Sequence, residues 1–135
     1  MGYSNIIDYV NIASIGNATD FGDLLAGNQY LTGCSNGTRG IFTGGYDGNH
    51  IDVIQYITIA SAGNATDFGD LSVDVYGPSA CSDGTKGCIG GGATETGGFQ
   101  RVTNIDYVNI TSIGNATDFG DLTVARTAIH ACSGD

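Results

Sequence analysis

The sequence contains few positive charges. Four Lys and Arg residues stand against fourteen Asp and Glu residues, which gives a formal net charge of −10. Phosphate backbones and anionic lipid surfaces repel such a chain, so we expect no nucleic acid and no membrane among its partners.

Long apolar stretches are also missing. No apolar run approaches the roughly 20 residues that span a bilayer, and the first ten residues, MGYSNIIDYV, lack the basic region and the apolar core of a signal peptide. We therefore expect neither a transmembrane segment nor a signal peptide. One Pro, no Trp and 23 Gly describe a turn-rich chain, and its Ile, Val, Tyr and Phe residues favour strands.

The chain is an internal repeat. The segment Ile105–Leu122, IDYVNITSIGNATDFGDL, recurs at Ile7–Leu24 with one difference and at Ile54–Leu71 as IQYITIASAGNATDFGDL. Consecutive copies start 47 and 51 residues apart, a period typical of solenoids, propellers and other arrays. We treat the chain as a single repeat domain, 1–135, with units at about 1–45, 46–92 and 93–135.

A turn follows the first two copies. Asn36-Gly37 and Asp83-Gly84 predict two-residue type I′ hairpins, because both central residues of that turn need positive φ. This places a strand that ends near Cys34 or Cys81 antiparallel to Arg39–Thr43 or Lys86–Gly90.

The repeated segment predicts a further strand at Ile7–Ser14, apolar on both faces and therefore buried on both. Gly16-Asn17 then turns the chain, while Asp20 and Asp23 can cap local backbone N–H groups. The recurrent aromatic residues are expected to be buried anchors: Tyr9, Tyr56, Tyr107, Phe21, Phe68 and Phe119.

Arg39–Gly45 (RGIFTGG) and Lys86–Gly92 (KGCIGGG) resemble the apolar strand of the kelch repeat that ends in Gly-Gly, and IDYVNIAS and DFGDL resemble its other strands, with Phe in place of Trp. The motif GNATDFGDL resembles motifs of kelch-like repeat proteins of marine bacteriophages. This resemblance implies a β-propeller in a virion or phage tail, assembled in the host cytoplasm and used for assembly or surface attachment.

The fold expectation is thus an all-β protein of kelch-like propeller blades, three repeats of about 50 residues with four short strands each. A β-trefoil or β-prism with pseudo-three-fold symmetry is the alternative, because those folds also build about this length from three similar units.

The repeated acidic loop is the candidate metal site. Its carboxylates are oxygen ligands of the kind that Ca²⁺ accepts, but the spacing is not that of an EF-hand and no bidentate Glu follows. Capping of turns is the favoured interpretation. The Ca²⁺ candidates are Asp20, Asp23, Asp67, Asp70, Asp118 and Asp121.

The four cysteines are interpreted as buried, reduced thiols. Cys34, Cys81 and Cys132 occupy one repeat position and are expected in different blades, too far apart to bridge. With a two-residue turn at Asp83-Gly84, Cys88 would lie diagonal to Cys81 rather than opposite it.

The segments that differ between repeats are where specificity can reside: Asp47–His50, Tyr76–Ser79 and Ala93–Arg101.

We expect no catalysis and no cofactor, because near-identical repeats place the same groups at symmetric positions, whereas catalysis needs unlike groups at one site. The predicted function is a non-enzymatic phage virion or host-attachment module; a free-standing carbohydrate-binding lectin is the alternative. The candidate contact residues are Asp47, Asn49, His50, Tyr76, Glu95 and Arg101.

The repeat count also predicts self-association. Three copies of the long segment accompany only two Gly-Gly strands, so the ends of the chain cannot complete a blade. We expect a homo-oligomer, most simply a dimer that closes a six-unit ring, with Met1–Ser14 or Thr123–Asp135 at the contact. Other virion proteins and surface glycans are the further expected partners.

Overall fold

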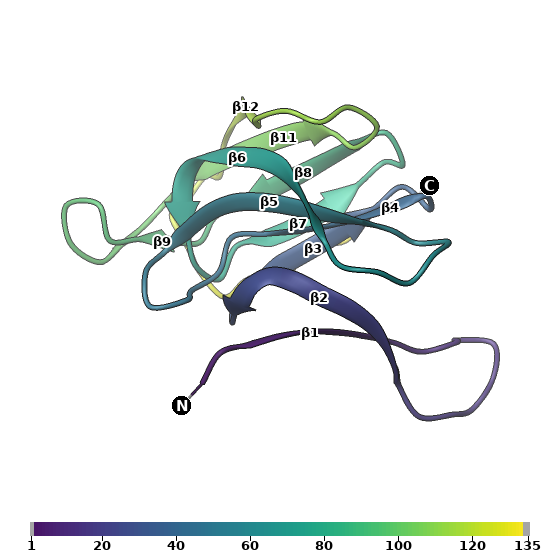
Figure 1. Cartoon of the computed structure of the whole chain (residues 1–135). Coiled ribbons are helices and arrows are strands. Elements are labelled where there is room, and N and C mark those ends of the chain that lie inside the picture. The colour runs from purple at the N-terminus through teal and green to yellow at the C-terminus, as the bar shows by residue number, and fades with distance from the viewer. Residues whose placement is uncertain (1, 134–135) are drawn as a thin grey trace.

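The computed structural model describes residues 2–133, and these form strands but no helix (Figure 1). The all-β expectation is therefore confirmed. None of the described residues belongs to a helix long and apolar enough to cross a membrane. The strands are β1 (Ser4–Tyr9), β2 (Thr19–Asn28), β3 (Thr32–Ser35), β4 (Arg39–Thr43), β5 (Ile51–Thr58), β6 (Thr66–Val75), β7 (Ser79–Ser82), β8 (Lys86–Gly90), β9 (Ala93–Thr94), β10 (Gln100–Arg101), β11 (Asn104–Asn109) and β12 (Thr117–Asp121).

These strands form small antiparallel sheets. The first sheet pairs β1 with β2, the second has the order β3-β4-β5-β6, and the third has the order β12-β11-β8-β7. A short β9–β10 hairpin projects beside them. Within residues 2–133 the sheets do not close into a ring, and each four-stranded sheet takes strands from two neighbouring sequence units.

The predicted hairpins β3–β4 and β7–β8 are present, but the two-residue turns are wrong. Ser35 pairs with Gly40 and Ser82 pairs with Gly87, so each loop has two more residues than expected. The cause is a side-chain cap: Oδ1 of Asp83 accepts hydrogen bonds from the N–H groups of Thr85 (2.8 Å) and Lys86 (2.7 Å). The same two bonds, with the one from Lys86 the stronger, lower the pKa of Asp83. Asn36 caps the first loop in the same way.

The sheets pack face to face, and the core lies between them. Between the first and second sheets, Ile7, Phe21 and Leu24 pack against Ile57 and Ala65. Between the second and third sheets the equivalent positions meet again, as Ile54, Phe68 and Leu71 with Val108 and the half-buried Ala116, and Ile110 adds to this core. One packing arrangement therefore occurs twice in the chain.

Main-chain hydrogen bonds join the sheets at the repeated loop. Gly63 N donates to Phe21 O (2.7 Å), Ala65 N donates to Asp23 O (2.8 Å), and Asp23 N donates to Oδ1 of Asn64 (3.1 Å). At the next junction Gly114, Ala116 and Asn115 make the same three bonds with Phe68 and Asp70, at 2.9, 2.8 and 3.1 Å. We call the side of a sheet that carries Phe-Gly-Asp its trailing face and the side that carries Gly-Asn-Ala its leading face.

Glycine is required at the centre of each junction. Gly69 has φ of +145°, and a Cβ there would lie 2.5 Å from the carbonyl oxygen of Gly114. Gly22 has φ of +147° and lies in the same way against Gly63. A side chain would both strain the backbone and push the sheets apart.

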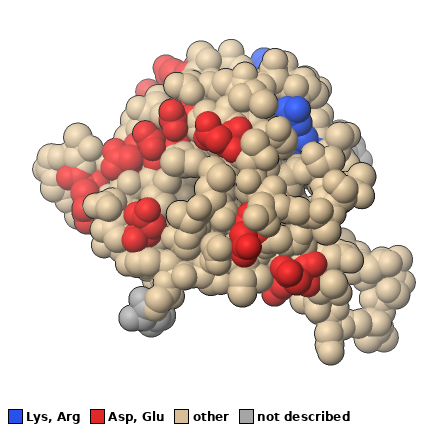
Figure 2. Space-filling model, in the orientation of Figure 1, with Lys and Arg blue, Asp and Glu red and all other residues tan. Residues whose placement is uncertain are grey.

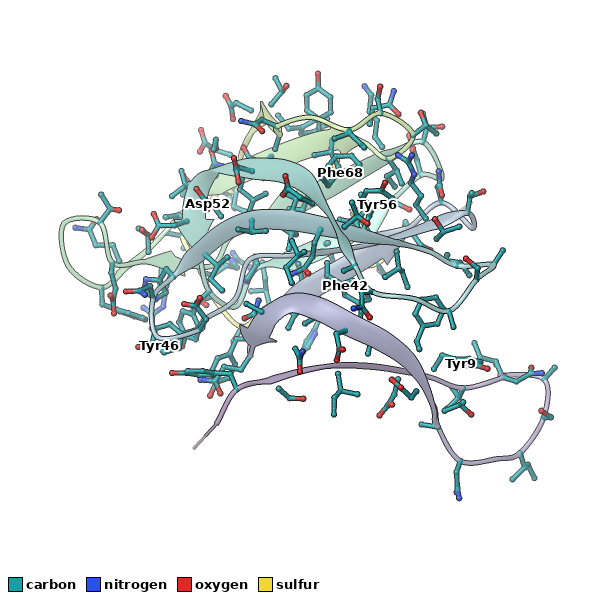
Figure 3. The ribbon with its side chains drawn as sticks, in the orientation of Figure 1. Tyr9, Phe42, Tyr46, Asp52, Tyr56 and Phe68 are labelled. Atoms are coloured by element: carbon teal, nitrogen blue, oxygen red, sulfur yellow. The ribbon has the colours of Figure 1, made fainter. Side chains whose placement is uncertain are left out.

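The predicted strand Ile7–Ser14 is too long, since β1 ends at Tyr9 and Ile12 is almost fully exposed. The aromatic anchors are confirmed only where a neighbouring sheet covers them. Phe21 and Phe68 are buried, whereas Phe119 is 59% exposed. Each Phe keeps an edge-to-face contact with the Tyr of its own repeat, at 5.9 to 6.0 Å between ring centroids; the pairs are Tyr9–Phe21, Tyr56–Phe68 and Tyr107–Phe119. Tyr9 is exposed, while Tyr56 and Tyr107 are half-buried. Figure 3 labels Tyr56 and Phe68, which lie close together on β5 and β6.

These differences predict unequal costs for one substitution. Phe68→Ala removes a ring that is 1% exposed and should lower the free energy of unfolding by about 3–5 kcal/mol. Phe119→Ala removes a ring that faces solvent in the single chain and should cost less than about 1 kcal/mol. Denaturant unfolding of dilute protein measures both values. Equal losses would contradict the packing described above.

Candidate ligand-binding site

The connections between the sheets bring aromatic side chains together at one end of the molecule. Tyr46, labelled in Figure 3, lies at the end opposite the loop that follows Tyr9. Its backbone pairs with Gln29 through two hydrogen bonds of 2.9 and 3.1 Å. The buried side chain of Asn28 fixes this corner, because it accepts from Tyr46 N (2.8 Å) and donates to Gly44 O (3.0 Å).

Tyr76 lies in the next connection and is held there by a similar pair of backbone hydrogen bonds. It exchanges two backbone hydrogen bonds with Ala93, at 2.9 and 3.0 Å. The following residue, Gly77, donates to the carbonyl oxygen of Tyr30 at 3.0 Å, which ties the two connections together. Tyr30 takes φ of +59°, a conformation that is uncommon for a large side chain.

Tyr76 is the centre of the aromatic cluster. Its ring stacks on His50 with centroids 5.4 Å apart and meets Tyr30 edge-on at 5.2 Å. The ring centroid of Phe99 lies 6.1 Å from that of Tyr76, and the Tyr46 ring contacts His50 with centroids 5.7 Å apart. These separations are those of favourable aromatic pairs, so the cluster is pre-formed.

The cluster lines an open pocket of about 220 Å³. Its walls are Gln29, Tyr30, Tyr46, His50, Tyr76, Glu95 and Phe99. The volume is below the roughly 300–1,000 Å³ of pockets that enclose a drug-sized ligand, so the pocket suits a single ring. Among the described residues, Nδ1 of His50 is the buried side-chain atom that has no hydrogen-bond partner.

The β9–β10 hairpin is anchored so that Glu95 reaches the pocket. Thr94 and Thr96 flank Glu95, and both hydroxyls donate to Oδ1 of Asp74 on β6, at 3.1 and 3.2 Å. Figure 2 shows acidic side chains gathered over β6 and towards this hairpin. The electrostatic field on this side of the molecule is therefore negative.

Three of the six predicted contact residues meet in this pocket: His50, Tyr76 and Glu95. Asp47 and Asn49 close their own turn, where Asn49 N donates to Oδ1 of Asp47 at 3.1 Å, and they do not line the pocket. Arg101 lies exposed on β10 and does not line it either.

Sequence reasoning missed Gln29, Tyr30 and Tyr46, and it included Phe99 in the variable segment Ala93–Arg101 without naming it as a contact residue. Two signals were available: Tyr46 follows Gly44-Gly45 directly, and Phe99 follows Gly97-Gly98. No comparable signal marks Tyr30.

The acidic loops take part in the junctions between sheets. Asp20 accepts from Gly22 N (3.1 Å) and Asp118 accepts from Gly120 N (3.2 Å), which is the capping interpretation. Asp23 and Asp70 contribute backbone groups to the junctions. Within residues 2–133, no three His, Cys, Asp or Glu residues lie close enough together to hold a metal ion.

The cysteines of the three repeats lie nearer to one another than we expected. Cys34, Cys81 and Cys132 line one groove of about 350 Å³ formed by β3, β7 and the C-terminal segment, although all are free thiols. Cys88 lies directly opposite Cys81 and not diagonal to it, because of the longer turn. The expectation of buried thiols is also wrong in part, since Cys132 is exposed and the other three are half-buried.

Comparison with known proteins adds no relative: no protein-family model matches the chain, and no curated protein matches it. The chain is an all-β repeat protein with an open pocket lined by aromatic residues.

The thiol groove gives a prediction about reactivity. Burial, followed by the neighbouring Cys81 and Cys88, raises the pKa of Cys34 from 9.0 to about 11. Below pH 9 the exposed Cys132 should therefore react with iodoacetamide first and Cys34 last, since the thiolate is the reactive form. Mass mapping of the alkylated native protein measures the order, and equal rates would contradict it.

The same shift has a sign for stability. Because the folded-state pKa lies above the unfolded value, the contribution of Cys34 to the free energy of unfolding is present below pH 9 and is lost as the pH rises towards about 11.

The number of free thiols is a separate prediction. Unfolded, unreduced protein should titrate as four thiols, and two missing thiols would indicate a Cys81–Cys88 bridge.

Proposed function

We propose that this chain is a non-enzymatic binding module that holds a neutral sugar ring of a surface glycan in the aromatic pocket. The observation that carries the proposal is the pre-formed cluster around Tyr76, whose neighbours Tyr30 and Phe99 both line the open pocket. Both of these rings are 60% exposed, so they offer free aromatic surface at the rim.

The chemistry of the lining suits a sugar. The C–H groups of a pyranose form apolar patches that pack on aromatic rings, while its hydroxyls need donors and acceptors. The tyrosine hydroxyls, the Gln29 amide and the Glu95 carboxylate supply these groups within one small concavity.

Charge narrows the ligand class. The chain has a net charge of −10 and the pocket contains Glu95, so sialylated or sulfated glycans are disfavoured. The absence of catalysis is part of the proposal. Glycoside hydrolysis generally uses two carboxylates, and among residues 2–133 Glu95 is the only carboxylate that lines the pocket.

The architecture we propose is that of kelch-like propeller blades. The strand orders β3-β4-β5-β6 and β12-β11-β8-β7, the face-to-face packing of the sheets and the contact of β3 with β7 support blades. Successive four-stranded antiparallel sheets are the units from which a propeller is built.

The virion setting follows from the kelch-like resemblance and stays part of the proposal, with the glycan as the host-surface group that an attachment module would hold. Labelling of phage particles with an antibody against the chain tests this setting separately. Particle labelling without any glycan binding would favour a purely structural role.

The glycan site predicts a difference between two matched variants. An array of neutral and anionic glycans should show binding to neutral sugars alone, and calorimetry with the bound monosaccharide gives the affinity. Phe99→Ala should weaken binding about tenfold, which corresponds to about 1.4 kcal/mol. Phe119→Ala removes an equally exposed Phe outside the pocket and should leave the affinity unchanged.

Two results would overturn the glycan proposal. One is silence of the array towards every neutral sugar, and the other is an equal loss of affinity in both variants.

A further inference from the structure

Each junction between sheets joins the trailing face of one sheet to the leading face of the next. Within the described residues, the leading face of the first sheet and the trailing face of the third sheet have no such partner. The first sheet covers the leading face of the second sheet, but no described residue covers its own leading face, so Val10 is 56% and Ile12 is 97% exposed. The equivalent residues of the third sheet, Val108 and Ile110, are 3% and 0% exposed in the core.

The trailing face of the third sheet is free in the same way. Ile105, Phe119 and Leu122 line a groove of about 430 Å³ that is mostly apolar. Their equivalents in the second sheet are Ile54, Phe68 and Leu71, which the third sheet covers completely enough to bury all three.

Hydrogen-bonding groups are free at both ends as well. No described residue comes within 4 Å of a Cβ built on Gly120, whereas a Cβ on the equivalent Gly69 would lie 2.5 Å from the carbonyl oxygen of Gly114. The leading loop Gly16–Ala18 is exposed and has the sequence Gly-Asn-Ala of the loops that dock inside the chain. Phe119 O, Asp121 O and Asp121 N are the equivalents of the groups to which those loops bind.

A fourth hydrogen bond extends the match. At the internal junctions, Oε1 of Gln55 accepts from Leu25 N (2.8 Å) and Oδ2 of Asp106 accepts from Ser72 N (2.7 Å). The equivalent residues at the free faces are Asp8 and Thr123. An acceptor and a donor are therefore both in place for this bond too.

The C-terminal segment already begins the next step of the array. Gly92 N donates to Arg126 O (2.9 Å) as Gly45 N donates to Val75 O (2.8 Å). Ala128 N donates to Gly77 O (3.0 Å), with Ala128 at φ of +54°, as Gly77 N donates to Tyr30 O. The segment after β12 thus follows the path of Val75–Gly77, the residues that lead from β6 towards β7.

We infer that the leading face of the first sheet docks on the trailing face of the third sheet of a second copy of this chain, head to tail. The occupant is this chain itself, because Ile7–Leu24 and Ile105–Leu122 differ at one position and the same interface already forms twice within one copy. This contact centres on Asp8–Ala18 and Phe119–Thr123, so it overlaps the expected segments Met1–Ser14 and Thr123–Asp135 only in part. It does not depend on the glycan proposal.

Sedimentation at low micromolar concentration tests the docking. The chain should sediment at twice its mass of 13.8 kDa or more. Ala18→Arg blocks the leading face, and Phe119→Arg blocks the trailing face; each should reduce the protein to a monomer, since both positions are exposed in the single chain. Phe99→Ala is the matched control and should assemble as the original chain does. Asn17→Ala, which removes one acceptor, should weaken assembly without a new charge.

Mixing the two blocked variants separates head-to-tail docking from other contacts. Each variant keeps the half that the other has lost, so an equimolar mixture should form a dimer through one intact junction. A monomeric original chain overturns the inference. So does an assembly that survives both Arg substitutions in folded protein, or a mixture that stays monomeric.

Discussion

The structure depends on the hydrogen-bonded contact between Gly-Asn-Ala of one sheet and Phe-Gly-Asp of the sheet before it. The contact uses backbone groups on both sides, a glycine without Cβ at its centre and one Asn side chain. Both halves belong to one continuous stretch, GNATDFGDL. Its Gly-Asn-Ala residues bind the preceding sheet, and its Phe-Gly-Asp residues bind the following sheet. This double duty gives a physical reason for the near identity of the three copies, because a change in either half would disturb a junction.

The candidate site lies outside these constrained stretches. Tyr46, His50, Glu95 and Phe99 belong to segments that differ between repeats, and four extra residues before the third copy provide the β9–β10 hairpin. A rigid framework that repeats and connections that vary are a common division of labour in binding proteins. As a result the three repeats form one aromatic pocket instead of three equal ones.

Much of the fold could be predicted from the sequence, but not the junctions. The Asn-Gly and Asp-Gly pairs predicted the β3–β4 and β7–β8 hairpins. The turn length was missed because Asn36 and Asp83 cap two N–H groups each, which holds a longer loop. Contact residues were predicted where repeats differ, whereas Tyr30 reaches the pocket through a backbone conformation that no residue pattern marks. The junctions between sheets are equally hard to predict, because they use backbone groups that every residue has. Gly and Asn are the residues in the sequence that indicate them.

Identical junctions also have a consequence for how the chain folds. During folding, the loop at Asn64 can bind the Phe-Gly-Asp segment at Phe21 or, equally well, the same segment of another molecule. The correct partner wins because Asp23 and Asn64 lie 41 residues apart in one chain, which keeps their local concentration above that of another molecule. This advantage shrinks as the protein concentration rises. Refolding yield should therefore fall steeply with protein concentration, and the lost material should be exchanged oligomers of native-like sheets, the usual error of repeat proteins.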